Sequence, residues 1–359
     1  MKKILLFSIL CLLFSPINIQ AISAQSAIVM DSDSNRVLYS KNSNEQKLIA
    51  STTKIMTSIV AIENGKLTDK VKVDESVLKA YGSAIYIELG EEITLQDLLY
   101  GLMLRSGNDA AIAISKYFEN KKMNLVDMMN DKAKELNMKD TVFFNPHGLE
   151  EDNGDANTST AYDMALLMSY AMKNKDFQKI TSTKNYTAKT SYKTYTWRNK
   201  NKLLFNYEFC NGGKTGFTKL ARRTLVTSAS KDNKNLVVVT LNDGNDFQDH
   251  KDLYVEYFNK YELLNVIDKD NFKIHNETYY TGVQFYVKNS FNMLATKEEK
   301  KSVSLNIILE KNEHFKDNQV IGKAQVMLYD ELIHEEEIYI VHKNKKNKQS
   351  FWSKIKNWF

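Results

Sequence analysis

The hydrophobic pattern of the 359-residue chain changes near Leu263, and this change limits the folds that the chain can adopt. Before this position, apolar residues recur at helical spacing through much of Ser51–Met172, with strand-like segments on both sides. After it, segments such as GVQFYVKN and EEIYIVHK alternate apolar and polar residues, which is typical of half-buried strands. The change predicts two domains, a mixed α/β domain at residues 25–262 and a small all-β domain at residues 263–341.

The first predicted domain combines an antiparallel sheet with a helical insert. Two short strands within SAIVMDSDSNRVLYSKN form a hairpin around Asp31–Asn35, and strands return between Tyr186 and Asn242. Segments with helical period lie between these strands, and a last helix follows them. The predicted helices are Ser51–Glu63, Thr94–Leu104, Asp109–Phe118, Leu125–Leu136, Thr160–Met172 and Asp249–Glu262. The fold class is therefore an α/β mixture in which helices flank an antiparallel sheet.

The first 24 residues have the layout of a secretory signal peptide, with two lysines, an apolar run and small residues near Ala21 and Ala24. The apolar run is shorter than the ~20 residues that a membrane-spanning anchor needs. We therefore expect an exported protein that acts at the outer face of the cytoplasmic membrane or in the cell wall space. Cys210 is the single cysteine after this segment, so no intramolecular disulfide can form and the fold depends on its hydrophobic core.

The net charge of +5 is unevenly distributed along the chain. Lys2 and Lys3 belong to the predicted signal peptide, and six lysines lie within residues 343–359. Removing these eight positive charges from +5 leaves about −3 for the rest of the chain. A mildly acidic body of this kind is not expected to bind nucleic acid.

The last segment, residues 342–359, combines a linker rich in lysine and asparagine with an amphipathic end. Its apolar residues fall on one face of a helix, and lysines lie among them. We expect this helix to lie on an anionic membrane surface, with a solvated tail as the alternative. The predicted membrane contacts are Phe351, Trp352, Ile355, Trp358 and Phe359.

The stretch LIASTTKIMTSIV places Ser51 three residues before Lys54 at a predicted helix start. The chain contains four serine–lysine pairs with this spacing, so the spacing alone is weak evidence. At positions i and i+3 two helical side chains share a face, and the amine can reach the hydroxyl. The free N–H groups of a helix start can also stabilise an oxyanion. Ser51 and Lys54 are therefore candidates for a nucleophile and its base, with an ordinary helix start as the alternative.

Two further motifs are candidates for the same site. Lys214, Thr215 and Gly216 form the only K-T-G in the chain, just before the predicted strand TLVTSAS. At a strand edge, the lysine and threonine can face a substrate carboxylate, and the glycine allows close backbone approach. Ser106 and Asn108, in LRSGNDAA, can relay protons and hold a substrate carbonyl, or can cap a helix instead.

Together and in this order, the three motifs resemble those of the penicillin-recognising serine acyltransferases. Within that superfamily the chain is most similar to the D-alanyl-D-alanine carboxypeptidases, the low-molecular-mass penicillin-binding proteins. The resemblance is also carried by NPHGL, KTGFTKLARRTLVTSA and GSAIYIELGEEITLQDLLYGLMLRSGNDAA. It implies the penicillin-binding, β-lactamase-like transpeptidase fold, followed by the small β domain.

The resemblance implies an acyl-enzyme mechanism that removes the terminal D-alanine from a peptidoglycan stem pentapeptide. Ser51 would attack the penultimate D-alanine carbonyl, with Lys54 as the base. Ser106 and Lys214 would pass a proton to the departing D-alanine, and water would then release the tetrapeptide. β-Lactam antibiotics would acylate Ser51 and stay, because the leaving group of the opened ring remains tethered.

The resemblance implies a wider set of substrate-binding residues. The backbone N–H of Phe217 would complete an oxyanion hole with that of Ser51. The chain departs from the family before the last helix, where NDGNDFQDHKD offers no arginine for the terminal carboxylate of the substrate. Arg222 or Arg223 is the expected replacement. The predicted binding set is Asn108, Lys214, Thr215, Gly216, Phe217, Arg222 and Arg223.

Two other functions compete with this interpretation. A β-lactamase of the same superfamily would need an E-x-x-L-N deacylation motif, which the chain lacks, and would leave the β domain unexplained. A non-catalytic wall-binding scaffold would not need all three motifs. No metal or cofactor is expected, and His147, His250 and Cys210 are interpreted as structural. The sequence does not distinguish vegetative wall trimming from modification of the spore cortex.

Overall fold

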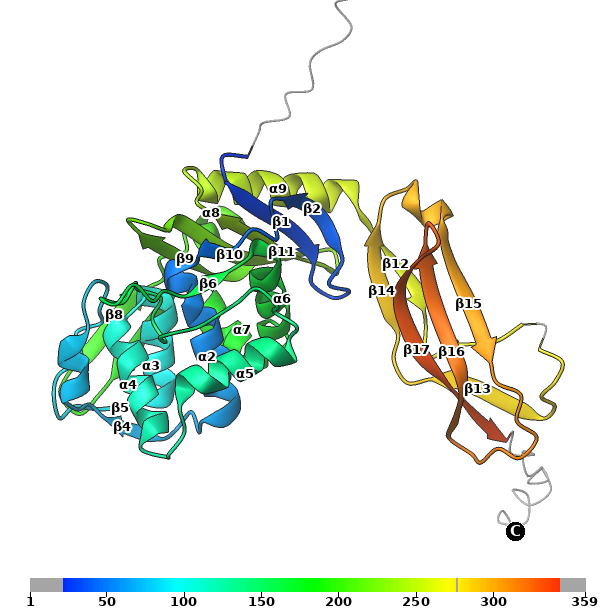
Figure 1. Cartoon of the computed structure of the whole chain (residues 1–359), viewed down its shortest axis with the longest axis horizontal. Helices are drawn as coiled ribbons and strands as arrows, with labels where there is room; N and C mark the ends of the chain where they lie inside the picture. The colour runs from blue at the N-terminus through cyan, green and yellow to red at the C-terminus, as the bar shows by residue number, and fades with distance from the viewer. Residues whose placement is uncertain (1–21, 276, 343–359) are drawn as a thin grey trace, which may run out of the picture.

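The structure is a computed structural model that describes residues 22–275 and 277–342. It has two lobes that diverge from a junction, a larger α/β lobe and a narrower all-β lobe (Figure 1). Most of the predicted signal peptide and all five predicted membrane contacts lie outside the described residues. Within the described ranges, no helix combines the length and the apolar character needed to cross a membrane.

A five-stranded antiparallel sheet forms the centre of the larger lobe, in the order β2-β1-β11-β10-β9. The predicted N-terminal hairpin and the predicted late strands therefore join in one sheet, and β9 forms one edge of it. The strands are β1 (Ser26–Asp31), β2 (Val37–Lys41), β9 (Cys210–Thr218), β10 (Arg222–Lys231) and β11 (Lys234–Leu241).

Helices cover both faces of this sheet. Successive side chains of its strands point to opposite faces, and each face is apolar and packs into a core of its own. Val237 and Val239 of β11 pack into the core that contains α2 and α6, whereas Leu236 and Val238 pack into the core under α9. Figure 1 shows α9 above the sheet and the helical insert below it. The covering helices are α2 (Lys54–Asn64), α6 (Ala161–Ala171), α8 (Leu203–Asn206) and α9 (Asp246–Lys260).

Four helices of the helical insert have N-termini that are capped by the side chain of the preceding residue. Thr94, Asn124, Thr160 and Asn174 each accept hydrogen bonds from backbone N–H groups of the first helical turn. The helices that these residues cap are α3 (Leu95–Tyr100), α5 (Leu125–Glu135), α6 and α7 (Lys175–Ser182). The insert also contains α4 (Asn108–Glu119) and the one-turn helices η2 (Ala50–Thr53), η3 (Glu75–Lys79) and η4 (Gly101–Arg105).

Three short strand pairs connect the helices of this lobe. They are β3 (Lys47–Leu48) with β6 (Thr158–Ser159), β4 (Lys70–Lys72) with β5 (Glu92–Thr94), and β7 (Asn185–Lys189) with β8 (Thr194–Arg198).

Several predicted helix ends were wrong. The helix predicted over Thr94–Leu104 is α-helical only to Tyr100 and continues as the π-helical turn η4, which ends at Ser106 in a left-handed conformation with φ of 64°. The last helix starts at Asp246 and ends at Lys260, so Glu262 is already the first residue of strand β12. Tyr261 is extended, which ends the helix there. Helices α7 and α8 were not predicted.

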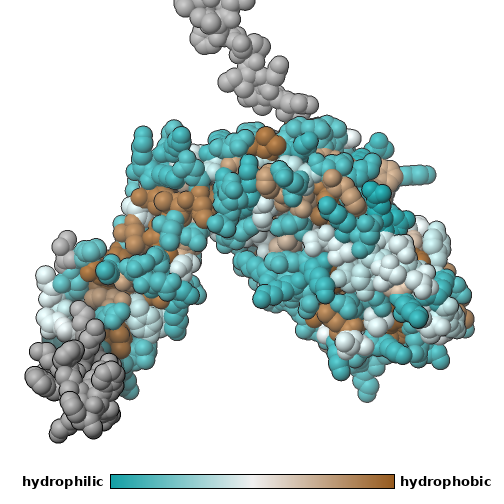
Figure 2. Space-filling view, turned by 180° about the vertical axis from the view of Figure 1, so that it is seen from behind, coloured by the Kyte–Doolittle hydropathy of each residue, from teal (hydrophilic) through white to brown (hydrophobic). Residues whose placement is uncertain are grey.

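The C-terminal lobe is a small all-β domain with its own apolar core. Strands β12 (Glu262–Ile267) and β14 (Phe291–Ala295) form one pair. A four-stranded antiparallel sheet has the order β13-β17-β16-β15. These strands are β13 (Val283–Val287), β15 (Val303–Leu309), β16 (Gln319–Leu328) and β17 (Glu331–His342), with the short helix η5 (Glu299–Lys301) before β15. Figure 2 shows apolar residues gathered on this domain near the junction of the two lobes.

The turn between β1 and β2 contacts the C-terminal domain directly. Arg36 donates to the carbonyl oxygen of Leu294 at 2.6 Å and pairs with Glu299, and both charged side chains are 14% exposed. The backbone N–H of Leu294 donates to Asp31 at 3.1 Å. These contacts join the two lobes away from the motifs of the first lobe.

Candidate active site

A cleft of about 320 Å³ lies between the edge strand β9 and the helical insert. The three sequence motifs meet in it, although they come from the η2–α2 junction, the η4–α4 turn and β9. The lining residues are Ser51, Ser83, Ser106, Lys200, Lys202, Thr215, Gly216, Phe217, Arg223, Asp246 and Phe247. Lys54 and Lys214 are buried at its base, 0% and 1% exposed.

Ser51 lies in the 3₁₀ turn η2, which leads directly into helix α2. Side chains at i and i+3 eclipse one another in a 3₁₀ helix, which brings Lys54 toward Ser51 more directly than an α-helical start would. Ala50, just before Ser51, has a left-handed backbone with φ of 45°. Such a conformation is uncommon for a residue other than glycine and persists where the surrounding structure enforces it.

Three oxygen atoms surround the Lys54 amine. Its Nζ lies 3.0 Å from Ser51 Oγ, 2.7 Å from Asn108 Oδ1 and 2.6 Å from the carbonyl oxygen of His147. Burial, and then the charge of Lys214, lower the pKa of Lys54 well below its ordinary value. A neutral amine has two hydrogens and one lone pair. Because the amide and carbonyl oxygens only accept, the hydrogens go to them and the lone pair faces the Ser51 hydroxyl.

Lys214 makes a second amine–hydroxyl contact in the same cleft. Its Nζ lies 3.0 Å from Ser106 Oγ and 2.6 Å from the carbonyl oxygen of Thr215. Burial, and then the charge of Lys200, lower the pKa of Lys214 to about 7. Near neutral pH this amine can therefore both give and take a proton. Ser106 reaches it from the left-handed end of η4, which the helical period of the sequence did not predict.

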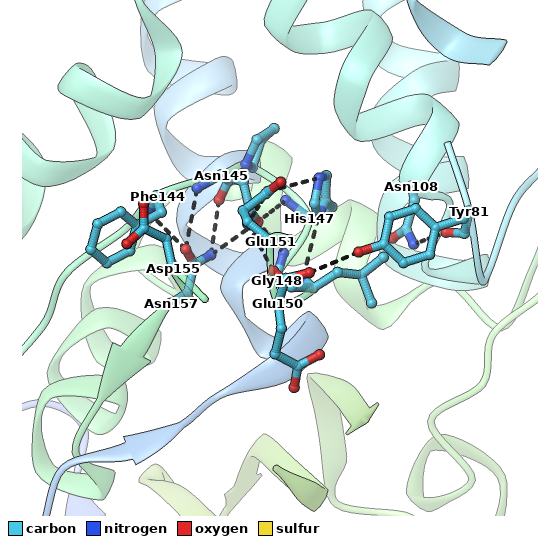
Figure 3. Close-up of polar contacts among 12 residues, drawn as sticks. Tyr81, Asn108, Phe144, Asn145, His147, Gly148, Glu150, Glu151, Asp155 and Asn157 are labelled. Carbon is cyan, nitrogen blue, oxygen red and sulfur yellow. Dashed lines mark hydrogen bonds and ion pairs between the residues drawn. The ribbon is translucent and has the colours of Figure 1, made fainter. Parts of the chain in front are cut away.

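Asn108 is the first residue of α4, and Gly107 rather than Ser106 or Asn108 occupies the cap position. The side-chain oxygen of Asn108 accepts from Lys54, and its nitrogen donates to the carbonyl oxygen of Tyr81 at 2.6 Å (Figure 3). An amide nitrogen carries two hydrogens, so one donor remains after the contact with Tyr81.

The K-T-G lies inside strand β9 rather than before a strand. Gly216 packs against Thr224 of β10 and against the turn η2, where an added Cβ would lie 3.0 Å from the backbone nitrogen of Ser51. A side chain at this position would push β9 away from the nucleophile, so only glycine permits this approach. Because β9 is an edge strand, an extended peptide can pair with its outer edge. Phe217, 60% exposed, stands at the mouth of the cleft.

The two predicted carboxylate-binding arginines lie in different places. Arg223 lines the cleft and pairs with the buried Asp246 at 2.5 Å. Arg222 is exposed, has a left-handed backbone with φ of 60°, and is not among the residues that line the cleft. The structure thus brings only one of the two arginines to the other site residues.

Sequence reasoning missed Lys200 and Lys202, which follow strand β8 and line the cleft. Lys200 donates from Nζ to Ser83 Oγ at 3.1 Å, across the cleft from β9. In the part of the chain that the structure describes, neither lysine forms an ion pair with a carboxylate. Burial, and then Arg105, lower the pKa of Lys200. The sequence RNKNK contains no local pattern that predicts this placement, because the conformation of the loop after β8 brings the two amines to the cleft.

Three further candidates are not placed to react: His250 and Cys210 are buried, and His147 is partly buried. Burial, and then Lys54, lower the pKa of His147 to about 4, so its contribution to the site is a backbone carbonyl. Burial lowers the pKa of His250 to about 3, and its ring lies between the hydroxyls of Thr227 and Thr240. Burial raises the pKa of the Cys210 thiol to about 11.

Comparison with known proteins agrees with this geometry. The family model described as D-alanyl-D-alanine carboxypeptidase matches residues 15–245, and the model described as penicillin-binding protein 5, C-terminal domain matches residues 261–348. The chain is similar in structure to penicillin binding protein 5 from Haemophilus influenzae, with a TM-score of 0.75 and 26% identity over 90% of this chain and 97% of that one.

Two curated relatives are similar in sequence. D-alanyl-D-alanine carboxypeptidase DacF of Bacillus subtilis is 39% identical over 60% of this chain and 56% of the relative. The D-alanyl-D-alanine carboxypeptidase of Streptomyces sp. strain K15 is 35% identical over 61% of this chain and 81% of the relative. The matched region thus spans little more than half of the Bacillus relative. Because the family model matches residues 15–245, more than half of the sequence, the chain belongs to the D-alanyl-D-alanine carboxypeptidase family.

Proposed function

We propose that the chain is a serine-type D-Ala-D-Ala carboxypeptidase that removes the terminal D-alanine from peptidoglycan stem pentapeptides. The observation that carries this proposal is the buried Lys54 amine 3.0 Å from Ser51 Oγ, with its other two contacts to carbonyl oxygens. A serine hydroxyl needs an adjacent base to become a nucleophile, and this arrangement supplies one.

In the acylation step, Ser51 Oγ attacks the carbonyl carbon of the penultimate D-alanine and its proton moves to Lys54. The backbone N–H groups of Ser51 and Phe217 stabilise the resulting oxyanion. The contact between Gly216 and the Ser51 backbone supports this assignment, because it keeps β9 close to the helix start. The remaining amide hydrogen of Asn108 binds a carbonyl of the stem peptide.

In the expulsion step, the C–N bond to the terminal D-alanine breaks and its nitrogen takes a proton from the Ser106 hydroxyl. Lys214, 3.0 Å from that hydroxyl and with a pKa of about 7, replaces the proton. Water then attacks the acyl carbon and its proton returns to Lys214 through Ser106. The bond from the acyl carbon to Ser51 Oγ breaks, Oγ takes back its proton from Lys54, and the tetrapeptide leaves. No metal or cofactor takes part in these steps.

The terminal carboxylate of the substrate binds at the cationic side of the cleft. The Thr215 hydroxyl and the Lys200 ammonium lie there, beside Ser106 and Lys214. Arg223 contributes less, because its guanidinium is already paired with Asp246. This assignment replaces the missing arginine of NDGNDFQDHKD with a lysine from the loop after β8.

The location of the protein is part of the proposal. Export rests on the signal-like first 24 residues, and attachment to an anionic membrane surface rests on the apolar and basic tail. The β domain would then hold the cleft away from the membrane surface and toward the wall.

A β-lactam tests the acyl-enzyme directly. Mass spectrometry of the chain after incubation with benzylpenicillin should show one adduct, located on the peptide that contains Ser51. A scaffold with an inactive site would take up no adduct. A β-lactamase would release the opened drug rapidly, so its adduct would not accumulate.

A further inference from the structure

The main chain at His147 contributes directly to the candidate active site. Its carbonyl oxygen lies 2.6 Å from Lys54 Nζ, and this is the shortest of the three contacts of that amine. The carbonyl belongs to the segment between Phe144 and Asn157, called here the His147 loop (Figure 3). Because the contact is made by the backbone, its position depends on whatever holds the loop.

The two carbonyl contacts determine where the Lys54 lone pair points. With both Asn108 Oδ1 and the His147 carbonyl in place, the two hydrogens of the neutral amine are occupied. If the His147 carbonyl moved away, one hydrogen would be free to turn toward Ser51, and the lone pair would turn away from it. A general base must be aligned with the proton that it removes, so this loss would slow acylation.

The Asn157 side chain fixes the start of the loop through five hydrogen bonds, of which the longest, 3.4 Å, runs from its nitrogen to Asn145 Oδ1. Its side-chain oxygen accepts from the backbone N–H groups of Phe144 at 2.7 Å and Asn145 at 3.2 Å. Its nitrogen donates to the Asn145 carbonyl at 2.9 Å and to Thr53 Oγ1 at 3.0 Å. Asn157 is 2% exposed, and Thr53 immediately precedes Lys54. This amide therefore ties the loop to the helix that carries the base.

Asn145 fixes the turn that presents the carbonyl. Its side-chain oxygen accepts from the N–H groups of His147 at 3.3 Å and Gly148 at 2.7 Å. Its nitrogen donates to the Leu149 carbonyl at 2.8 Å and to Glu151 at 2.7 Å (Figure 3). The charge state of the ring of His147 does not enter, because its pKa of about 4 keeps it neutral.

The His147 loop also packs closely against η2, the turn that carries Ser51. Gly148 has φ of 84°, and an added Cβ would lie 2.0 Å from the carbonyl oxygen of Ala50. Ala50 is the left-handed residue just before Ser51. One loop thus contacts the backbone next to the nucleophile and the amine of its base.

We propose that Asn157 and Asn145 are positioning residues for the reaction, because they fix the His147 carbonyl that aims the Lys54 amine at Ser51. The inference rests on the proposed function. It assigns to two buried amides an effect on the chemical step that their contribution to stability alone would not produce.

The chain offers a matched control for stability in Asn130 of α5. Its side chain also bridges backbone groups, accepting from Phe143 N–H at 2.9 Å and donating to the Phe143 carbonyl at 2.8 Å. It holds the residue before the loop but makes no hydrogen bond to Thr53 or to the residues around the His147 carbonyl. Asn130→Ala should therefore cost stability without misaligning the amine.

The experiment measures the acylation rate constant for nitrocefin with the full chain and with Asn157→Ala, Asn145→Ala and Asn130→Ala, from pH ~5 to ~10. Acylation of Asn157→Ala and Asn145→Ala should slow about tenfold or more at every pH, and that of Asn130→Ala by about twofold at most. The charged groups that face Lys54, namely Lys214, Lys200 and Asp109, are the same in all of these chains.

The pH profile of the acylation rate constant distinguishes a misplaced Lys54 amine from a general loosening of the site. The charged form of Lys54 has three hydrogens that need acceptors, so loss of the His147 carbonyl destabilises the charged form or leaves it unchanged. The pKa at which acylation falls off on the acid side should therefore stay where it is or move to lower pH. Water entering a loosened site would instead stabilise the charged amine and move this pKa to higher pH, toward the value of an exposed lysine. Such an upward shift, or equal rates for Asn157→Ala and Asn130→Ala, would overturn the inference.

A milder variant covers the case in which the alanine variants do not fold. Thr53→Val removes one partner of Asn157 and keeps the shape of the side chain. Its acylation should slow about threefold with a smaller loss of stability than in Asn157→Ala, since one of five side-chain bonds is lost. A rate equal to the unmodified chain would contradict the inference. Failure of the unmodified chain to react with nitrocefin at all would instead overturn the proposed function.

Discussion

Lys214 and Ser106 are joined by a 3.0 Å contact between Nζ and Oγ, although they lie 108 positions apart in the sequence. A second contact of the same length joins Lys54 to Ser51. The cleft therefore holds two amine–hydroxyl pairs, and both amines are buried and have lowered pKa values. One pair is placed to activate a nucleophile and the other to protonate a leaving group.

The pKa of Lys214 predicts how stability depends on pH. The folded chain holds this pKa at about 7, below the value of about 10.4 expected in the unfolded chain. Between these values the unfolded chain binds the additional proton, so the free energy of unfolding rises with pH by up to about 1.4 kcal/mol per unit. Urea unfolding of Lys214→Met should show a smaller rise between pH ~7 and ~10 than the unmodified chain. Lys54 contributes with the same sign, so the rise should shrink without vanishing; equal slopes would contradict the buried neutral amine.

Lys200 should set the preference for a free terminal carboxylate. A hydrogen bond to a charged group contributes about 1.5–3 kcal/mol, so Lys200→Met should lower kcat/KM for a D-Ala-D-Ala peptide by about tenfold or more. The loss should be small for the same peptide with a C-terminal amide, because that substrate has no carboxylate to bind. The measurement is kcat/KM for both peptides with the unmodified chain and the variant.

Arg223→Met is the matched comparison, since Arg223 lines the same cleft but is already paired with Asp246. It should reduce the preference for the free acid less than Lys200→Met does. Equal losses on the acid and the amide with Lys200→Met would show that this lysine does not bind the carboxylate.

Gly148 and Gly154 make a matched pair for the packing of the His147 loop. Both have a left-handed backbone, with φ of 84° and 91°, but only at Gly148 does an added Cβ meet other atoms. Gly154→Ala should cost about 1 kcal/mol from its backbone conformation. Gly148→Ala should cost about 3 kcal/mol or more, because its Cβ would overlap the Ala50 carbonyl, and should also slow acylation. Similar unfolding curves for the two variants would contradict the close packing of loop and nucleophile turn.

Cys210 should be unreactive in the folded protein. Its side chain is 8% exposed, and burial raises its pKa to about 11, so little thiolate is present near neutral pH. A thiol reagent such as DTNB should label the native chain slowly and the urea-unfolded chain rapidly. Rapid labelling of the native chain would place the thiol at an accessible position.

The overall architecture could be predicted because it follows from local patterns. The helical period marked α2, α4, α5 and α6, and the alternation after Leu263 marked the all-β domain. The pattern failed where backbone conformation departs from the regular elements. The π-helical turn η4 continues the apolar run of α3, so the helical period predicted one helix as far as Leu104. The left-handed Ser106 lies in the polar stretch RSGND that follows, where no periodic pattern indicates the backbone conformation. Helix α7 was missed because it is short, although Asn174 provides its cap.

The site could be predicted only in part. The motif residues were identifiable because each has a local spacing, as in Ser51 with Lys54. Lys200 and the His147 carbonyl were not, because the first is a loop lysine without local context and the second is a backbone atom. Arg222 and Arg223 were chosen for their charge and their closeness to the K-T-G, but adjacent strand residues point to opposite faces and only one can line the cleft.

The most direct test of the account is the release of D-alanine from a diacyl-Lys-D-Ala-D-Ala peptide by the chain and by Ser51→Ala. We expect steady release by the unmodified chain and none above background by the variant, because Ser51 supplies the one hydroxyl that contacts the Lys54 amine among the residues that the structure describes. Release that persists in Ser51→Ala would contradict the assignment of the nucleophile. Absence of release from the unmodified chain, together with no penicillin adduct, would contradict the carboxypeptidase itself.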